Sequence, residues 1–304
     1  MPPLRHRGAR GDPGATLHVL LSVVPEVTRV NEEILAQLSR ADAVLGGLIS
    51  AVGPCKLAAP EDCHPFQVLA QAIAHQQLNG TAANTILKRL VDSCGRGTFP
   101  TPHQVLEAPV ESLRAAGFSF AKVAALKDLA AKTLAAVVPD GAALMQLSDE
   151  QIIARLTQVR GVGRWTVEML LMFQLGRPDV LPVDDFGVRA GFRAAYGLTR
   201  MPHAKALAAW GERWKPFRTT AAWYLWRALE LKRAGTLPAP AERIRLPRVK
   251  KPRRAARRGA AGLKRGKPRA RTAVRARKVR AGRAAPRGRG GGKTGKARKV
   301  RKKG

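Results

Sequence analysis

The chain has 304 residues, enough for one or two domains with a buried core. Lys and Arg number 55 against 21 Asp and Glu, and the formal net charge of +34 excludes an acidic protein. No apolar run reaches about 18 residues, so no transmembrane helix is expected. The three cysteines are an odd number in a long chain, which argues against a disulfide framework and favours a reducing, cytoplasmic location.

Residues 1–30 are predicted to form an N-terminal extension. They contain three arginines before a short apolar run, LHVLLSVV, which resembles a secretion signal. Pro25 and Glu26 follow this run instead of small cleavage-site residues, so an extension is the preferred interpretation. From residue 31 to about residue 238, Ala and Leu dominate and apolar residues recur every three or four positions. This pattern indicates an all-α domain of roughly ten helices.

Breakers and caps place the helices of this domain. One amphipathic helix, ILAQLSRADAVLGGLISAV, ends at the Gly-Pro pair 53–54, and two more flank the Asn-Gly pair 79–80. A short and a longer helix follow, PVESLRAAGF and AKVAALKDLAAKTLAAV, with Gly117 as a C-cap. Ser148 and Gln151, three residues apart, form a capping-box signature that opens the next helix.

Residues 239–304 differ in composition from the domain before them. Residues 241–304 hold 28 of the 55 Lys and Arg residues and one acid, Glu242, and they lack aromatic residues. Such a segment buries too little apolar surface to offset its ordering entropy, so a disordered tail is expected. Its charge is similar to that of linker-histone tails and predicts binding to DNA phosphates without sequence preference. A solubilising or localising extension is the alternative.

The most informative stretch is LTQVRGVGRWTVEMLLMFQLGRPDVLPVDDFGVRAGFRAAYG, residues 156–197. A helix that ends near Val159 is followed by the turn RGVGR and by a second helix that starts near Trp165. Gly161 and Gly163 permit a tight turn, and the free amides at the start of the second helix suit a phosphate oxygen. An ordinary corner between two helices would also contain two such glycines.

Four blocks in this order resemble the helix-hairpin-helix DNA glycosylases, and among them the DNA-3-methyladenine glycosylase II family. The blocks are QAIAHQQLNG, GVGRWT, LPVDDF and ERWKPFRTTAAWYLW, and the resemblance extends from about Phe66 to Glu230. It implies two helical subdomains with a cleft between them. It also implies that the blocks are a DNA-penetrating turn, a phosphate-binding hairpin, a catalytic segment and a C-terminal helix.

The resemblance assigns the catalytic carboxylate to Asp185, and Asp184 is expected to cap the following helix. Positive charge builds on the deoxyribose as the glycosidic bond stretches, and a fixed carboxylate stabilises that charge and can orient water. Without the resemblance, either aspartate could be a plain helix cap.

The expected reaction follows from a missing lysine. In the endonuclease III branch a hairpin lysine forms a Schiff base, but Trp165 occupies its place, and no lysine lies between Lys132 and Lys205. No cysteine follows Cys94, so the four-cysteine iron–sulfur cluster of that branch is not expected. These features predict a monofunctional enzyme in which water is the nucleophile and an intact abasic site is the product. The histidines and cysteines lack metal-ligand spacing, so no catalytic metal is predicted.

The resemblance also indicates which residues contact the extruded base. Trp165 and Trp226 are the stacking candidates, since a cationic alkylated purine is attracted to an indole face. Trp210 and Trp214 are expected to pack in the core. Met169 stands where relatives often have a tyrosine, which leaves the range of lesions open. The expected base contacts are Trp165, Trp226, Met169 and Phe186.

The expected DNA contacts lie on the hairpin and on the turn after QAIAHQQL. Hairpin amides would bind a lesion-strand phosphate, and one side chain of the turn would fill the gap that the extruded base leaves. Register favours Gln77 for this wedge, with Leu78 as its neighbour, although Gln77 could simply face solvent. The DNA-binding residues are therefore expected to be Gly161, Val162, Gly163, Arg164, Gln77 and Leu78. The resemblance further implies a monovalent cation on the carbonyls of Thr157, Val159 and Val162.

The sequence thus predicts a base-excision DNA glycosylase that removes alkylated purines such as 3-methyladenine and 7-methylguanine. It is expected to act as a monomer on double-stranded DNA at the nucleoid, with no membrane partner. One alternative is a non-catalytic nucleoid protein that binds DNA through the hairpin and tail. Another is a glycosylase for deaminated or etheno-adducted bases or uracil. Asp185 distinguishes the enzyme from the non-catalytic DNA-binding protein. In a protein that only binds DNA, a carboxylate that faces the DNA would have no use and would repel phosphate.

Overall fold

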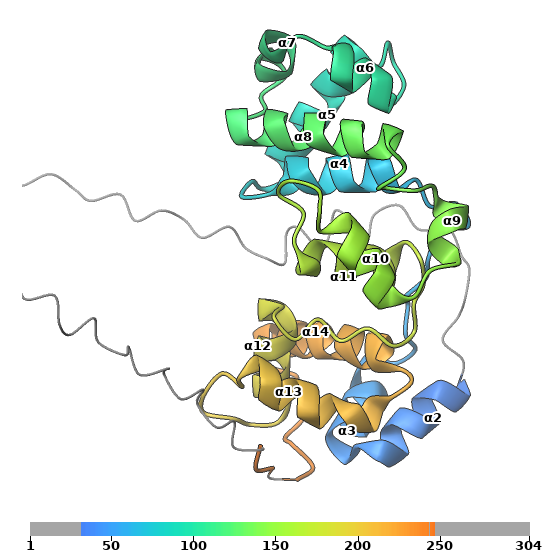
Figure 1. Ribbon diagram of the computed structural model, residues 1–304. Helices are drawn as coiled ribbons and strands as arrows, with labels where there is room; N and C mark the ends of the chain where they lie inside the picture. The colour runs from blue at the N-terminus through green and yellow to red at the C-terminus, as the bar shows by residue number, and fades with distance from the viewer. Residues whose placement is uncertain (1–31, 243, 247–304) are drawn as a thin grey trace, which may run out of the picture. The chain divides into compact units, whose positions relative to one another are not determined.

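The computed structural model describes residues 32–242 and 244–246, which form thirteen α-helices and one short 3-10 helix and contain no strand (Figure 1). The helices are α2 (Glu32–Ala41), α3 (Ala43–Val52), α4 (Pro65–His75), α5 (Gly80–Cys94), α6 (Pro102–Glu107), α7 (Val110–Ala115), α8 (Phe120–Leu134), α9 (Gly141–Met145), α10 (Asp149–Leu156), α11 (Arg164–Phe173), α12 (Phe186–Ala195), α13 (Ala204–Gly211), η1 (Glu212–Trp214) and α14 (Arg218–Ala234). The all-α prediction is confirmed. The predicted extension, residues 1–30, and residues 247–304 of the predicted tail lie outside the described residues.

The first predicted helix is two helices in the structure. The chain breaks at Asp42, whose Oδ1 accepts hydrogen bonds from the amides of Val44 and Leu45 and so caps α3. An aspartate before a new helix satisfies amides that have no intrahelical partner. The prediction of one continuous helix was wrong here, because apolar periodicity does not reveal a break between two successive apolar helices.

Asn79 and Ser148 cap two of the later helices, and the C-cap of α7 is Ala116, one residue before the predicted Gly117. The side chain of Asn79 accepts from the Ala82 amide at 2.8 Å and caps α5. Ser148 and Gln151 form a complete capping box at the start of α10, with each side chain bonded to the other residue's amide. These caps fix where α5 and α10 begin, and α10 leads directly into the hairpin.

The helices pack in two groups that share one buried apolar cluster. In the first group α4 packs on α5 and α8, and α8 packs on α6 and α7 (Figure 1). In the second group α12 and α14 pack on each other and on α3, which also contacts α2. The helix α11 packs on both α10 and α4. The hairpin between α10 and α11 is therefore held against the first group.

Two glycines allow the close contact between α12 and α14. A Cβ atom at Gly191 would lie 1.8 Å from the carbonyl oxygen of Leu225, and one at Gly187 would lie 2.7 Å from Cδ1 of Trp226. Only a residue without a side chain fits at these two places. The contact brings Trp226 next to the first turn of α12.

The packed part of the chain continues past the boundary predicted at residue 238. Ile244 and Leu246 are partly buried and pack against the core, as does Leu237. The change in composition predicted the boundary too early, because a few apolar residues within a basic segment are enough to dock it.

Candidate active site

Asp185 lies between two of the tryptophans that the sequence singles out. Its side chain is buried, and its Oδ2 accepts a hydrogen bond from Nε1 of Trp165 at 2.8 Å. Its Oδ1 accepts from Nε1 of Trp226 at 2.9 Å. Trp165 is on α11 and Trp226 on α14, so three segments that are distant in sequence meet at one carboxylate.

The same carboxylate caps α12. Oδ1 of Asp185 also accepts from the amide of Val188 at 2.6 Å, whereas Asp184 is exposed. The prediction that Asp184 is the cap was wrong, because α12 begins at Phe186 and its N-cap is the residue directly before. All three groups bonded to Asp185 are N–H donors, the set that suits an ionised, acceptor-only carboxylate. The positive end of α12 favours the same charge.

A cavity of about 390 Å³ lies between α4 and α11. Trp165 forms part of its wall and also donates to Asp185, which links the cavity to the carboxylate. Apolar side chains of both helices form much of the remaining wall, and Gln76, Gln77 and Gln174 supply polar groups. A cavity of this size, with a mostly apolar wall and a few polar groups, is typical of a site for a small molecule.

The expected base contacts separate into two sets. Trp165 and Met169 line the cavity. Trp226 does not, because it stacks on Phe173 with ring centroids 5.7 Å apart and directs its N–H to Asp185. Phe186 is 58% exposed and also lies outside the cavity wall. The structure therefore places Trp226 as a support of the carboxylate, a difference from its expected place on the wall.

The hairpin uses one of the amides that the resemblance assigns to phosphate binding. The amide of Val162 donates to the carbonyl of Val159 at 3.0 Å, so it already has an acceptor, contrary to expectation. The amides of Gly161 and Gly163 have no acceptor in the described part of the chain. Gly163 is the N-cap of α11 and has no side chain to cap it, which leaves the first amides of α11 open.

Two side chains, one from the turn after α4 and one from α8, brace the hairpin. Nε2 of Gln76 donates to the carbonyl of Gly161 at 2.7 Å, and Oδ2 of Asp128 accepts from the amide of Arg160 at 2.7 Å. Burial by itself would raise the pKa of Asp128. The hydrogen bonds from the Arg160 amide and from Lys132 outweigh burial and lower this pKa below its usual value. Sequence reasoning missed both braces, because each joins residues far apart in the chain.

The turn after α4 presents Gln77 and retains Leu78. Gln77 is exposed and has a φ of 59°, a left-handed conformation that is uncommon for a residue other than glycine. Leu78 is partly buried and packs against the core. Of the two residues expected near the extruded base, Gln77 is therefore the one whose side chain is free to move. Its role as a wedge stays a prediction.

A second carboxylate is bound by tryptophans in the core. Trp210 and Trp214 are buried, as predicted, and donate to Oδ2 of Asp42 at 3.1 and 3.0 Å. The hydroxyl of Tyr196 donates to the same oxygen at 2.6 Å. Burial, with the neighbouring charge of Asp42, raises the pKa of Tyr196 well above its usual value. No sequence motif marks this site.

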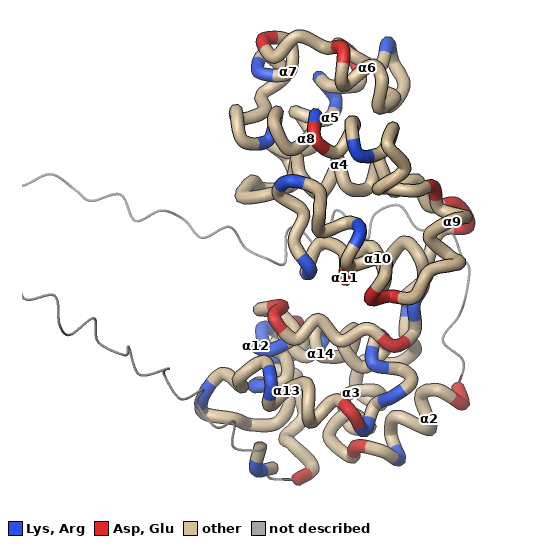
Figure 2. Tube along the Cα trace, viewed as in Figure 1, with Lys and Arg blue, Asp and Glu red and all other residues tan. Residues whose placement is uncertain are grey.

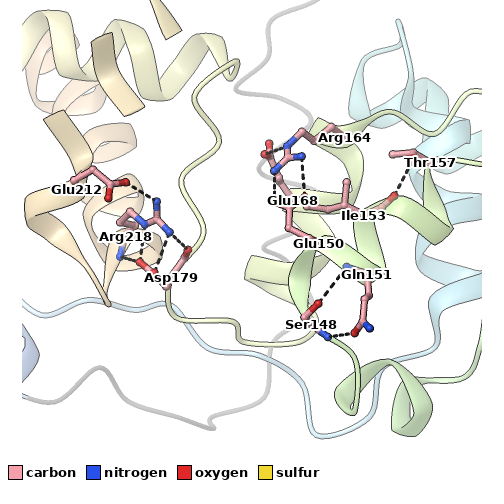
Figure 3. A network of polar contacts seen from close by, with 10 residues as sticks. All are labelled: Ser148, Glu150, Gln151, Ile153, Thr157, Arg164, Glu168, Asp179, Glu212 and Arg218. Carbon is pink, nitrogen blue, oxygen red and sulfur yellow. Dashed lines mark hydrogen bonds and ion pairs between the residues drawn. The ribbon is translucent and has the colours of Figure 1, made fainter. Parts of the chain in front are cut away.

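Glu168 is a buried acid that the sequence analysis overlooked. It lies on α11, and Nε of Arg164 donates to its Oε1 at 3.0 Å (Figure 3). Burial raises the pKa of Glu168 to about 7; Arg164 opposes the rise, and the charges of Asp184 and Asp185 add to it. A lone acid in the apolar run VEMLLMF was the available signal. Lys and Arg positions occur in the part of the chain around α10 and α11 (Figure 2).

Residues 32–242 and 244–246 contain no group of three or more His, Cys, Asp or Glu side chains placed to hold a metal ion. Over the same range, none of the helices combines the length and the apolar character that crossing a bilayer requires. The monovalent cation expected at the hairpin would use backbone carbonyls and stays a prediction.

Comparisons with known proteins agree with this arrangement. The sequence model of the HhH-GPD superfamily of base excision DNA repair proteins matches residues 70–216. DNA-3-methyladenine glycosylase 1 of Schizosaccharomyces pombe is 40% identical over 208 residues, which are 66% of this chain and 91% of that protein. DNA-3-methyladenine glycosylase 2 of Escherichia coli K12 is 26% identical over 227 residues, which are 69% of this chain and 76% of that protein.

Two solved structures are also similar. The 3-methyladenine DNA glycosylase of S. pombe, in complex with abasic DNA, superimposes with a TM-score of 0.59 and 39% identity, over 64% of this chain and 95% of that one. DNA-3-methyladenine glycosidase of Bacillus halodurans gives a TM-score of 0.62 and 31% identity, over 68% of this chain and 94% of that one.

The helical fold and the glycine hairpin define a helix-hairpin-helix protein of DNA base excision repair, and this chain belongs to the HhH-GPD superfamily. The relatives just described carry the name of 3-methyladenine glycosylases, and the resemblance predicted from the four sequence blocks is confirmed.

Proposed function

We propose that this protein is a monofunctional DNA glycosylase that extrudes alkylated purines from double-stranded DNA and hydrolyses their N-glycosidic bond. Purines of the 3-methyladenine and 7-methylguanine type would be released, and an abasic site would remain in an uncut strand. The names of the relatives support the lesion class, and a structure of one of them in complex with abasic DNA supports DNA as the substrate.

Asp185 carries this proposal. Its carboxylate is buried, and two indole N–H groups from separate helices and one backbone amide fix its orientation. As the bond to the base stretches, positive charge develops on the deoxyribose, and a fixed carboxylate in a dry site stabilises it without having to reorganise. The same carboxylate can orient the water that attacks the sugar.

Trp165 supports hydrolysis by water instead of attack by an amine. It occupies the hairpin position at which a bifunctional relative would place a lysine, and an indole nitrogen cannot form a Schiff base. Its N–H is engaged by Asp185, and its ring lines the cavity. A cationic purine in the cavity would meet the ring of Trp165 and the thioether of Met169.

Three further features belong to the proposal. The hairpin would hold a monovalent cation, and the Thr157 carbonyl suits it because it stands at the C-terminal end of α10, where carbonyls lack intrahelical partners. The protein would act as a monomer on one DNA site. It would be found with the nucleoid, since its formal charge of +34 favours DNA.

The decisive experiment measures free bases released from methylated duplex DNA by the wild type and by Asp185→Asn. We expect the wild type to release 3-methyladenine without cutting the strand, and the variant to lose about 10²-fold to 10³-fold in single-turnover rate. Release that survives the substitution would remove Asp185 from the mechanism. Binding of DNA without release from any alkylated substrate would favour the non-catalytic DNA-binding protein.

A further inference from the structure

Arg164 is shared between two acids at the start of α11 (Figure 3). Its Nη2 and Nη1 donate to the two oxygens of Glu150 at 2.7 and 3.3 Å, which is a bidentate contact. Its Nε donates to Glu168 at 3.0 Å. The guanidinium is thus held at its inner edge by one acid and covered at its outer edge by the other.

The two acids differ in their exposure to solvent. The side chain of Glu150 is 74% exposed, that of Arg164 is 53% exposed, and that of Glu168 is 8% exposed. An exposed ion pair contributes little to stability, so Glu150 can leave at small cost. Glu168 is buried on α11 itself and cannot leave without local unfolding. Its bond to Nε anchors the inner edge of the guanidinium on α11.

A second arginine with two acidic partners has the opposite arrangement. Nε and Nη2 of Arg218 donate to the two oxygens of Asp179 at 2.7 and 2.9 Å, and Nη1 reaches Glu212 only at 3.4 Å (Figure 3). Asp179 is the less exposed of these two acids. The forked face of Arg218 therefore points to its inner partner, whereas that of Arg164 points outward to an exposed one.

We propose that Glu150 occupies on Arg164 the place of a DNA backbone phosphate, which displaces it when DNA binds. Two oxygens of a phosphate match the two Nη donors as a carboxylate does. Arg164 is the first residue of α11, beside the open amides of the hairpin, so a phosphate that reaches those amides also reaches the outer edge of the guanidinium. Glu168 keeps the guanidinium in position during the exchange. This inference rests on the DNA binding of the proposed function.

The test measures binding to a duplex with one abasic site, by fluorescence anisotropy over a range of salt concentrations. Glu150→Gln removes the competing charge, so we expect binding to tighten about threefold to tenfold. Glu212→Gln makes the same change in net charge at the inward-facing arginine and is the matched control, with an expected change of less than twofold. In an Arg164→Ala background, Glu150→Gln is expected to have no effect. Arg164→Ala itself is expected to reduce the slope of log affinity against log salt by about 0.9, the value for one phosphate.

Several outcomes would overturn the exchange. Equal tightening by Glu150→Gln with and without Arg164, or equal tightening by Glu150→Gln and Glu212→Gln, would show general repulsion of DNA. If Arg164→Ala does not fold, as judged by circular dichroism, Arg164→Lys replaces it, because lysine keeps the charge and lacks the fork. A wild type that releases no base but shows the coupling would contradict only the proposed chemistry. A wild type that releases base without the coupling would contradict only the exchange.

Discussion

Asp42 and Asp185 each cap a helix, and each accepts hydrogen bonds from two tryptophan side chains. Asp42 accepts five bonds in all: two amides of α3, two indoles and the hydroxyl of Tyr196. Asp185 accepts three. A carboxylate has about four lone-pair directions, so Asp42 has none left, whereas Asp185 retains capacity for another contact.

The surroundings of the two aspartates also differ, because Asp42 is enclosed by the core whereas Asp185 lies next to a cavity. Trp210 and Trp214 bury the bonded edge of Asp42 inside the second helix group. Trp165 is only partly buried, and its ring lines the cavity while its N–H donates to Asp185. An aspartate bonded to two tryptophans is therefore a structural anchor at Asp42, where every acceptor direction of the carboxylate is used. The same combination is a candidate catalytic group at Asp185, where one acceptor direction is unused and a cavity lies next to it.

The strongest test of this comparison applies one substitution to both aspartates. Asp42→Asn puts an NH2 group opposite at least two N–H donors, and each unsatisfied buried donor costs about 1–3 kcal/mol. We expect the free energy of unfolding to fall by about 4 kcal/mol, measured by urea denaturation. The excision rate per folded molecule should remain that of the wild type.

Asp185→Asn serves as the counterpart and should show the reverse pattern, with a lost rate and a small change in unfolding free energy. Equal losses of stability at the two sites would mean that Asp185 is also an anchor.

Glu168 is a third buried acid, and within the described residues it accepts only one hydrogen bond, from Arg164, compared with five at Asp42 and three at Asp185. Its pKa is raised from 4.5 to about 7, so the folded protein holds this proton more tightly than the unfolded chain does. The resulting stabilisation is complete below about pH 4.5 and is lost as the pH rises through about 7, a change of about 3 kcal/mol. Urea denaturation at pH 5 and pH 8 should show this loss in the wild type and not in Glu168→Gln.

Glu150→Gln is the control for that measurement, because the Glu150 carboxylate is exposed and Arg164 lowers its pKa. An unchanged pH dependence in Glu168→Gln would contradict the assignment to this acid.

The smallest expected effect concerns the contact that aims Asp185. Gly187→Ala would bring a Cβ within 2.7 Å of Cδ1 and 2.9 Å of Nε1 of Trp226, so the indole must shift from the carboxylate. Losing one oriented donor from a preorganised site should slow excision by about tenfold, measured in single turnover. Gly47→Ala, also within a helix and with no neighbour within 4 Å, should leave the rate unchanged. Equal rates for the two variants would show that Trp226 does not orient Asp185.

The sequence predicted the parts of the fold that depend on local chemistry. The capping box of Ser148 and Gln151 and the helix break at the Asn-Gly pair 79–80 involve neighbouring residues, and both are present as expected. The break at Asp42 was missed, because its hydrogen bonds to α3 resemble those of any aspartate and its bonds to Trp210 and Trp214 cross more than 160 residues. Apolar periodicity reports which face is buried and does not report which helix covers it.

The sequence also predicted some residues of the candidate site and missed others. The resemblance identified Asp185 and Trp165, which the structure joins by one hydrogen bond. It gave Trp226 a place on the cavity wall, and the structure gives it a donor role, because α14 approaches α12 at Gly187 and Gly191. Gln76 and Glu168 were missed, since a glutamine on a turn and an acid within a helix acquire meaning only from the group they face in space.

The core carboxylate also limits how far the protein can be shortened. The family match begins at residue 70, whereas Asp42 lies well before it and binds side chains between residues 196 and 214. A version trimmed to the matched stretch would retain Asp185 and deprive a phenol and two indoles of their common acceptor. A fragment that begins at residue 70 is therefore expected to be less stable than one that keeps α2 and α3, because three buried donors lose their acceptor.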